Sequence, residues 1–441
     1  MPMLALDNVT LHRGTTRVLD SVSLAVNEGE LVALIGANGA GKTTVLRTIS
    51  GILAPSAGTI TFRGKPIQGA DPDVIVRLGI AHCPEERKIW PQMTVQEHLE
   101  LGAFIRADGG EIAQDMTDLA DFHYFDQVWK EFFPSPPPRT TVQVSGLLVP
   151  GCRVEIDLIG VRPGVERRVI TGAATPTPMA HYCQGVVVGD TLYAAGQIAS
   201  DYRTGVPPEA RRDPAFPYYA SDIQRQTRYV LQNIASVYRA AGCDFADTVK
   251  AQVFLTDLDD FVHFNAVWRE FFSSPPPRTT VQIGALLVPG CRIEIDLTAV
   301  HKRVPRKVIA TADSPTPQAH YSQALLAGET LYLAGQLASH PETGMAAEAR
   351  QDPAFPYYGS NIQKQTRHVL KNLRNVLKSA GLSLDDVVKS QVFLTDLNDF
   401  YYMDQVWKEF FPSPPPRTTL QVSGLLVPEC RVEIDLTACR R

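Results

Sequence analysis

The segment FFSSPPPRTTVQIGALLVPGCRIEIDLTAV (271–300) decides how the chain is organised, because it returns with few changes at 132–161 and at 410–439. A spacing of 139 residues therefore separates three arginines, three cysteines and three glutamates: Arg139, Arg278 and Arg417; Cys152, Cys291 and Cys430; Glu155, Glu294 and Glu433. A unit of this length is too long for a solenoid repeat, so the repetition predicts tandem copies of one domain.

The unit is complete in two places and partial in a third. We call 117–161 the partial repeat, 168–300 the second repeat and 307–441 the third repeat. Aligned at this spacing without a gap, the two full copies share 80 identities in 131 positions. The partial repeat keeps only the last third of the unit. Residues 1–116 have no counterpart elsewhere in the chain and form a separate N-terminal segment.

Strand and helix patterns alternate in the third repeat. A short apolar strand is predicted at 331–336, an amphipathic helix at 362–377 and a strand at 386–397. A second helix follows at 399–411, and a closing strand at 432–436. This order predicts an α+β fold in which helices cover one face of a sheet.

The composition is that of an ordinary globular protein. The chain has 441 residues, of which 44% are apolar and 20% charged, and its net charge is −5. This balance argues against a nucleic-acid or anionic-membrane binder, which needs a basic face. No apolar run is long enough to cross a bilayer, no secretory signal is visible, and the seven cysteines form no CxxC pair. We therefore predict a cytoplasmic protein with reduced thiols, no metal site and no direct membrane insertion.

The N-terminal segment contains a phosphate-binding motif. An apolar strand predicted at 30–36 leads into GANGAGKT (36–43), which fits G-x-x-x-x-G-K-[ST], and then into a helix. Backbone N–H groups of such a loop surround phosphate oxygens, Lys42 reaches the outer phosphates, and Thr43 offers a hydroxyl to Mg²⁺. A glycine-rich turn without function is the alternative. The predicted nucleotide-binding residues are Gly36, Asn38, Gly39, Gly41, Lys42, Thr43 and Thr44.

Residues 1–106 resemble the ATPase subunits of ABC transporters, most closely the branched-chain amino-acid group of the LivF type. VSLAVNEGELVALIGANGAGKTTVLRTISG (22–51) and IAHCPEERKIWPQMTVQEHLELGAF (80–104) carry the resemblance, which covers the first half of such an α/β domain and implies ATP and Mg²⁺ as ligands. The signature loop and the water-positioning carboxylate of the second half do not follow, and phosphoryl transfer needs both. We expect no ATP hydrolysis, leave nucleotide binding open, and expect the half-sheet to have an unpaired edge.

The repeats resemble the RidA (YjgF-type) imine deaminase family. The carrying segments are AHYCQGVVVGDTLYAAGQIA (180–199), PPPRTTVQI (275–283) and RIEIDLTAV (292–300) in the second repeat, with AHYSQALLAGETLYLAGQLA (319–338) and PPPRTTLQV (414–422) in the third. The family hydrolyses reactive enamines and imines, such as 2-aminoacrylate, to 2-keto acids and ammonia without a cofactor. The resemblance thus implies a hydrolase for small imino or enamino acids on a chorismate-mutase-like α+β fold.

The resemblance also implies which residues act. A carboxylate-binding arginine, a water-positioning glutamate and an active-site tyrosine fall on Arg278, Glu294 and Tyr182 in the second repeat, and on Arg417, Glu433 and Tyr321 in the third. Further substrate-binding positions are Gly196, Asn265, Thr280, Gly335 and Thr419. Chemistry supports this assignment, because a guanidinium can hold a carboxylate with two hydrogen bonds and imine hydrolysis needs little beyond an oriented water.

Each assignment has a structural alternative: the arginine could cap a loop, the glutamate could be a solvent-facing strand residue, and the tyrosine could be core packing. Cys291 has no partner histidine in sequence, so a structural thiol is preferred. Asn265 matches a family asparagine, whereas the third repeat has Asp404 and the partial repeat Asp126 there. An added acid beside the arginine would repel an anionic substrate.

The family forms trimers with active sites between protomers, so the resemblance implies a homo-oligomer in which three chains build two trimeric rings. The partial repeat keeps Arg139 and Glu155 but lacks the tyrosine strand and the first helix, and we expect it to be inactive and poorly ordered. Three alternatives stay open: a nucleotide-binding component of a branched-chain amino-acid transporter, a non-catalytic small-ligand-binding protein on the same fold, and a fusion of gene fragments without a stable product.

Overall fold

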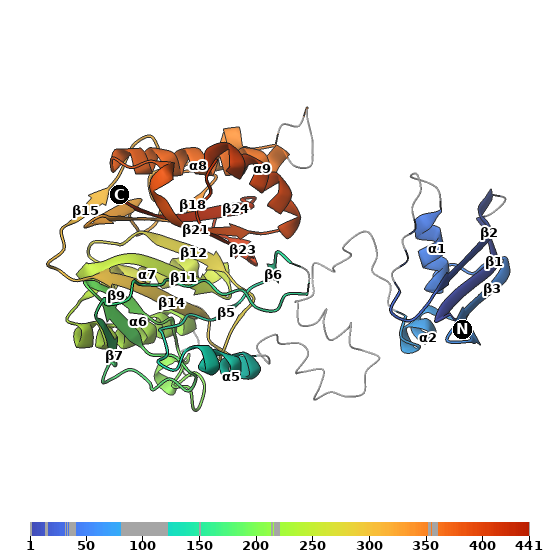
Figure 1. Cartoon of the computed structure of the whole chain (residues 1–441), viewed down its shortest axis with the longest axis horizontal. Coiled ribbons are helices and arrows are strands. Elements are labelled where there is room, and N and C mark those ends of the chain that lie inside the picture. The colour runs from blue at the N-terminus through green and yellow to red at the C-terminus, as the bar shows by residue number, and fades with distance from the viewer. Residues whose placement is uncertain are drawn as a thin grey trace. The chain divides into compact units, whose positions relative to one another are not determined.

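The computed structural model of the chain divides into two compact units, Met1–Thr117 and Asp118–Arg441 (Figure 1). Each unit has its own sheets and its own buried core. The structure describes residues 2–13, 16–30, 32, 34, 41–80, 122–149, 151–212, 215, 221–351, 354 and 360–440.

Over its described residues, the N-terminal unit contains an antiparallel sheet and two short helices. Its elements are β1 (Leu4–Arg13), β2 (Thr16–Val26), α1 (Lys42–Ile49), β3 (Ala57–Phe62), β4 (Lys65–Pro66) and α2 (Pro72–Arg77). The strand order is β2-β1-β3-β4. Val9 and Ile60 of the sheet pack with Val45 of α1 in the core. The strand predicted at 30–36 lies largely outside the described residues.

The second repeat is a sheet covered by two helices. Its elements are β7 (Arg167–Ile170), β8 (Gly185–Val188), β9 (Thr191–Ala194), β10 (Gln197–Ile198), α6 (Ser221–Ala241), β11 (Thr248–Leu255), α7 (Phe261–Phe271), β12 (Arg278–Gln282), β13 (Ala285–Leu286) and β14 (Ile293–Val300). β11 and β12 run parallel because α7 crosses between them. β14 lies in the middle of the sheet and pairs antiparallel with β11, β9 and β10.

The third repeat has the same core arrangement. Its elements are β15 (Arg306–Ile309), β16 (Ala324–Ala327), β17 (Thr330–Leu333), β18 (Gln336–Leu337), β19 (Ser339–His340), β20 (Gly344–Met345), α8 (Ser360–Ser379), β21 (Val387–Leu394), α9 (Phe400–Phe410), β22 (Arg417–Gln421), β23 (Gly424–Leu425) and β24 (Val432–Cys439). Short 3₁₀ helices occur at Pro208–Ala210, Phe245–Asp247, Leu258–Asp260, Ala347–Ala349, Leu384–Asp386 and Leu397–Asp399. The predicted α+β class is confirmed, although the strand predicted at 331–336 is divided between β17 and β18.

The partial repeat joins the full repeats in a closed cycle of strand pairs. It contributes α5 (Phe122–Phe132), β5 (Val142–Gln143) and β6 (Gly146–Leu147). β5 pairs with β13 of the second repeat, β12 of the second repeat with β23 of the third, and β22 of the third repeat with β6. Three repeats of one chain thus form a ring that the sequence analysis assigned to three chains. The expectation of a poorly ordered partial repeat is not met by α5, β5 and β6, because the full repeats supply partners for both strands.

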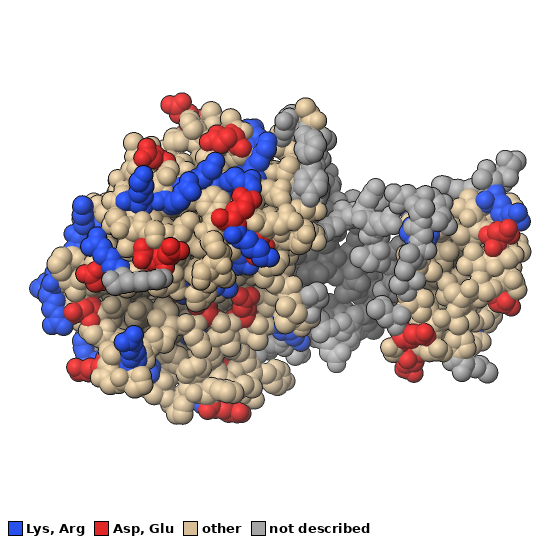
Figure 2. Space-filling view, turned by 45° about the horizontal axis from the view of Figure 1, so that its top comes forward, with Lys and Arg blue, Asp and Glu red and all other residues tan. Residues whose placement is uncertain are grey.

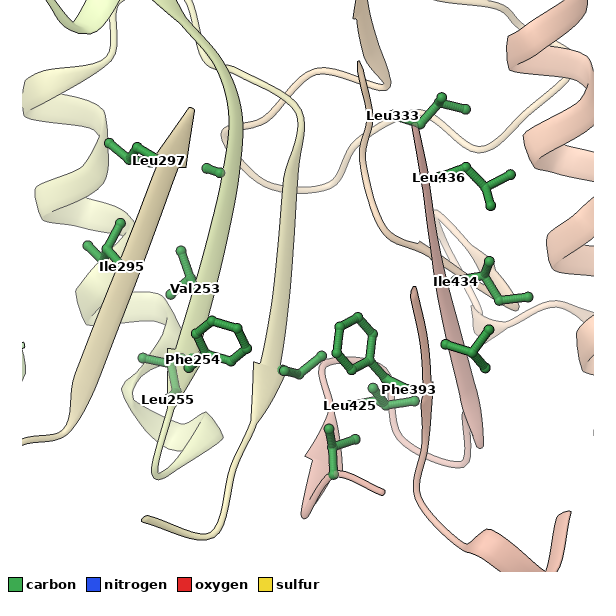
Figure 3. Packing of buried hydrophobic residues seen from close by; sticks show 14 of the residues in the cluster. Val253, Phe254, Leu255, Ile295, Leu297, Leu333, Phe393, Leu425, Ile434 and Leu436 are labelled. Atoms are coloured by element: carbon green, nitrogen blue, oxygen red, sulfur yellow. The ribbon is translucent and has the colours of Figure 1, made fainter. Parts of the chain in front are cut away.

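The two full repeats share a core between their sheets. Side chains alternate across a strand, so one face of each sheet packs on its own helices and the other faces the neighbouring repeat. Ile295 and Ile434 lie on the helix sides, whereas Phe254 and Phe393 meet between the sheets (Figure 3). All four side chains are buried. The stacking of the repeats is therefore part of the hydrophobic core of the unit.

The surface carries both signs of charge. On the face of the molecule shown in Figure 2, Lys and Arg side chains are interspersed with Asp and Glu side chains over the larger unit. Among the helices that the structure describes, none is long and apolar enough to cross a membrane.

Candidate functional site

Each repeat places an arginine directly after a proline run and against the aromatic face of its second helix. Arg278 begins β12, and its guanidinium carbon lies 5.0 Å from the ring centroid of Phe264 and 5.1 Å from that of Trp268 on α7. Arg139 lies in the same way over rings of α5, and Arg417 over rings of α9. Proline fixes the backbone ahead of the arginine, and the aromatic faces stabilise the buried cation.

At Arg139 and Arg278, the tyrosine and glutamate that lie near the arginine come from the next repeat. We call the first cluster site A: Arg139 and Thr141 of the partial repeat with Tyr182, Gly196 and Glu294 of the second. The guanidinium of Arg139 lies 5.8 Å from the ring centroid of Tyr182, and the Thr141 N–H donates to Glu294. All five residues line one cavity of about 230 Å³, together with Phe122, Met179, Ala180, Ile198, Tyr202, Leu287 and Val288.

The second cluster, site B, repeats this arrangement one step along the ring. It consists of Arg278 and Thr280 of the second repeat with Tyr321, Gly335 and Glu433 of the third. Arg278 lies 5.9 Å from the ring centroid of Tyr321 and attracts Glu433, which accepts the N–H of Thr280. Sites A and B are thus the same constellation, and each is built across a boundary between repeats.

A third set, set C, is incomplete. Glu155 of the partial repeat accepts the N–H of Thr419 of the third repeat, and Arg417 stands two residues before Thr419 in β22. The partial repeat begins after the position at which its tyrosine and glycine would stand, so the chain supplies neither to set C. Only two of the three boundaries therefore carry the full constellation.

Glycine is required where the backbone passes the glutamate. A Cβ built on Gly196 would collide with Oε1 of Glu294, and one on Gly335 with Oε1 of Glu433. The N–H groups of these glycines donate to the hydroxyls of Thr140 and Thr279, both at 3.1 Å. The GQ segments therefore hold the carboxylates in place by close backbone approach.

Burial gives both glutamates an unusual proton affinity. Desolvation raises the pKa of Glu294 to about 8; Asp296 raises it further, while the Thr141 N–H and Arg139 oppose the change. The pKa of Glu433 also rises to about 8, through burial first and then Asp435. Each carboxyl is thus largely protonated at neutral pH and can both give and take a proton.

The other groups keep their ordinary charge states at neutral pH. Burial raises the pKa of Tyr182 and of Tyr321 to about 12, so both hydroxyls stay protonated. Burial lowers the pKa of Arg278 to about 9, against the attraction of Tyr321 and Glu433, and the guanidinium remains a cation. Burial raises the pKa of the Cys291 thiol to about 12, which makes a poor nucleophile.

The structure regroups the residues that the sequence analysis assigned by repeat. Arg278 and Glu294 lie in different sites, as do Arg417 and Glu433. Arg139, which the sequence analysis left in an inactive remnant, lies in site A. The constant 139-residue spacing, read together with sites between neighbouring copies, was the signal that could have paired each arginine with the next repeat.

The other predicted binding residues lie beside these sites, in the N-terminal unit, or outside the described residues. Asn265 accepts a hydrogen bond from Nη2 of Arg278 at 3.1 Å, and Thr280 and Thr419 contribute their backbone N–H groups. In the N-terminal unit, Gly41 precedes α1 in the left-handed region, and Lys42, Thr43 and Thr44 form the first turn. Three predicted nucleotide-binding residues lie outside the described residues: Gly36, Asn38 and Gly39. Among the described residues, no group of three or more His, Cys, Asp or Glu side chains is placed to hold a metal ion.

Comparisons with known proteins agree with this architecture. Residues 172–301 and 311–440 each match the family described as Endoribonuclease L-PSP, and together they span more than half of the chain. A RutC family protein of Pyrococcus horikoshii is 40% identical over 121 residues, which are 27% of this chain and 87% of that protein. A 2-iminobutanoate/2-iminopropanoate deaminase of Capra hircus is 36% identical over 135 residues, 30% of this chain and 90% of the relative. The chain belongs to the Endoribonuclease L-PSP family, which includes the RidA proteins.

A second family covers the N-terminal part. Residues 19–135 match the ABC transporter family, and this match overlaps α5 of the partial repeat. A high-affinity branched-chain amino acid transport ATP-binding protein of Pseudomonas aeruginosa is 41% identical over 102 residues, which are 23% of this chain. The matched region is 44% of the length of that relative, so the chain spans less than half of it.

Proposed function

We propose that sites A and B hydrolyse small enamines and imines of the 2-aminoacrylate type to 2-keto acids and ammonia. The observation that carries the proposal is that sites A and B each bring together an arginine, a tyrosine and a buried glutamate with a raised pKa. In each site a glycine backbone passes close to the glutamate. The family membership and the relative named as a deaminase support a hydrolase of this kind. Retention of the glutamate favours an enzyme over a binding protein, because holding a carboxylate would need only the arginine.

The proposed reaction is R–C(=NH)–COO⁻ + H₂O → R–C(=O)–COO⁻ + NH₃. The arginine holds the substrate carboxylate through charge-assisted hydrogen bonds. The glutamic acid gives its proton to the imine nitrogen, and the resulting carboxylate takes a proton from the water that bonds to the imine carbon. A second exchange through the same carboxyl protonates the amino group and removes the hydroxyl proton, so that the C–N bond breaks and ammonia leaves. One carboxyl with a pKa near neutrality suffices for both directions.

The test is release of ammonia and pyruvate from freshly generated 2-iminopropionate by the full chain. Arg139→Ala and Arg278→Ala each remove the arginine of one complete site, and the double variant should fall to the uncatalysed rate. Arg417→Ala is the matched control, because it makes the same change in the incomplete set C and should leave the rate unchanged. A double variant as fast as the unmodified chain would contradict the proposal.

We further propose that the N-terminal unit binds a nucleotide without hydrolysing it. Gly41 in the left-handed region ahead of α1, with Lys42 and Thr43 in its first turn, fits a loop that surrounds phosphate oxygens, and the match to the ABC transporter family supports ATP with Mg²⁺ as the ligand. Binding of ATP·Mg²⁺ by calorimetry, lost in Lys42→Ala, tests this role. A partnership with a branched-chain amino-acid transporter would follow from that family alone. Co-purification of the chain with the membrane subunits of such a transporter would test it.

A further inference from the structure

Sites A and B differ in the group that pairs with the arginine. In site A, Nη2 of Arg139 donates to Oδ1 of Asp126 at 3.0 Å, and the Asp126 side chain is 8% exposed. In site B, Nη2 of Arg278 donates to the amide oxygen of Asn265 at 3.1 Å. Nη1 of both arginines is buried without a hydrogen-bond partner in the structure. Both guanidinium groups therefore have Nη1 available for a ligand, but only the charge of the site A arginine is already paired with a carboxylate.

Asp126 is a carboxylate rather than a neutral acid. Burial acts to raise its pKa, but the N–H of His181 and the cations Lys130 and Arg139 lower it below the usual value. Lys130 reaches Oδ2 of Asp126 at 3.1 Å from a half-exposed position. The second repeat has Arg269 at the position of Lys130, so this surface cation does not distinguish the sites. The difference is one buried negative charge.

The second and third repeats also differ at two positions that line the cavity of site A. The cavity of site A includes Met179 and Tyr202, and the hydroxyl of Tyr182 donates to that of Tyr202 at 2.9 Å. At the corresponding positions of the third repeat stand Gln318 and Pro341. Site A therefore has an apolar Met179 where the third repeat has a polar Gln318, and the hydroxyl of its Tyr182 already donates to Tyr202.

We propose that Asp126 and Asn265 set the relative substrate preference of their sites: site B favours imines with a free α-carboxylate, and site A favours uncharged imines with an apolar body over their carboxylate analogues. This inference rests on the proposed function. Arg278 donates to the neutral amide of Asn265 rather than to a carboxylate, so a substrate carboxylate supplies the paired negative charge. The charge of Arg139 is already balanced by Asp126, which would repel a second carboxylate in the cavity.

We expect sites A and B to discriminate strongly between carboxylate imines and uncharged imines, because the Asp126 carboxylate and a bound substrate carboxylate would both be buried. A substrate carboxylate about 6 Å from the carboxylate of Asp126 would be repelled by it. In a partly buried site this repulsion weakens affinity on the order of 10- to 100-fold. A neutral substrate feels little of this repulsion. The ratio of kcat/KM for a carboxylate imine to that for its uncharged analogue is therefore the quantity that separates the sites.

The experiment isolates each site in the full chain. Glu294→Gln leaves only site B, and Glu433→Gln leaves only site A. Each variant is assayed with freshly generated 2-iminopropionate and with its primary amide, 2-iminopropanamide, and the ratio of the two kcat/KM values is compared. We expect this ratio to be at least 10-fold higher for site B.

Exchanging the paired residue assigns the effect. In the Glu433→Gln chain, Asp126→Asn should raise the ratio 10- to 100-fold, and in the Glu294→Gln chain Asn265→Asp should lower it by a similar factor. Each substitution installs a residue that already occupies the position in another repeat, and thermal unfolding of each variant reports whether it folds. A merely structural role would lower the rates for both substrates together and leave the ratio in place.

The outcomes separate this inference from the proposed function. If neither single-site chain hydrolyses either imine, the proposed function fails. If both hydrolyse imines with the same ratio, or if the exchanges leave the ratio unchanged, the deaminase function stands and the division of substrates is overturned.

Discussion

The hexapeptide RVEIDL occurs at 153–158 and again at 431–436, and the two copies have different structures. At the later position it lies largely within β24, in the middle of a sheet, and Val432 and Leu436 are fully buried. At the earlier position the structure describes every residue and assigns no strand, and Val154 and Leu158 are 54% and 59% exposed. Identical residues therefore make a central strand only where neighbouring strands exist to pair with them.

The same comparison explains what the partial repeat retains. It keeps the elements that it gives to its neighbours: the α5 helix, the short strands β5 and β6, and Arg139. It lacks the strands that its own closing segment would need, and with them the tyrosine and glycine of set C. A fragment of a domain can thus complete a neighbouring site while being unable to form its own.

The largest expected effect is on catalysis. Glu294→Gln and Glu433→Gln together remove both proton-transferring carboxyls, and we expect imine hydrolysis to fall by about 10²- to 10⁴-fold. Glu155→Gln makes the same change in the exposed copy of the hexapeptide, within set C, and should leave the rate unaltered. Steady-state ammonia release from 2-iminopropionate measures all three. A comparable loss with Glu155→Gln would mean that set C is completed in some other way.

The next effect is on stability. Leu436→Ala empties a fully buried position of β24 and should lower the free energy of unfolding of its unit by about 2–5 kcal/mol. Leu158→Ala changes the same residue of the hexapeptide where it is exposed, and should cost no more than about 0.5 kcal/mol. Urea unfolding followed by tryptophan fluorescence compares them. Similar losses at both positions would show that the partial repeat buries its closing segment.

Much of the fold followed from the sequence, because the signals were local. The helical period over 362–377 and the alternation around Glu433 fixed α8 and β24 to within a few residues. The 139-residue spacing gave the number of copies. The division of the strand at 331–336 was missed because the backbone there turns to approach Glu433, and no pattern of side chains encodes that approach.

The site was predicted in its residue types but not in its pairing. Sequence similarity identified Arg278 and Glu433 separately, yet only the ring of strand pairs shows that they face one another. Arg139 was discounted because its own repeat is incomplete, although the residue lies beside Tyr182 and Glu294 of the second repeat. The partners of a buried side chain depend on which repeat is its neighbour, and that is a property of the assembled fold.

The raised glutamate pKa values predict a pH dependence. The proposed mechanism needs protonated Glu294 or Glu433, so the rate should fall above pH 8, by about tenfold per pH unit. Both pKa values are raised from the ordinary 4.5, so the folded chain binds more protons than the unfolded chain between these values. Stability is therefore greatest below pH 4.5 as far as these groups are concerned, and is lost as the pH rises towards 8.

Two pH profiles check this prediction. The kcat/KM profile of the unmodified chain should bend near pH 8, and the unfolding profile of the Glu294→Gln/Glu433→Gln chain should lose the decline between pH 4.5 and 8. Glu155→Gln should retain most of that decline. A bend near pH 5 would show that the carboxyls are hydrated and act only as bases.

The smallest effect concerns Asp157, the acid of the exposed hexapeptide that forms an ion pair with the third repeat. Asp157 contacts Nζ of Lys389 at 2.8 Å, with both side chains partly exposed, whereas its counterpart Asp435 contacts the buried Lys250 at 2.5 Å. A partly exposed ion pair contributes little, so Asp157→Asn should lower the free energy of unfolding by about 0.5–1 kcal/mol. A double-mutant cycle with Lys389→Met, read by urea unfolding, isolates the pair. A coupling above about 2 kcal/mol would mean that this contact is buried, and that the partial repeat is held to the third repeat more by Asp157 than by the pairing of β6 with β22.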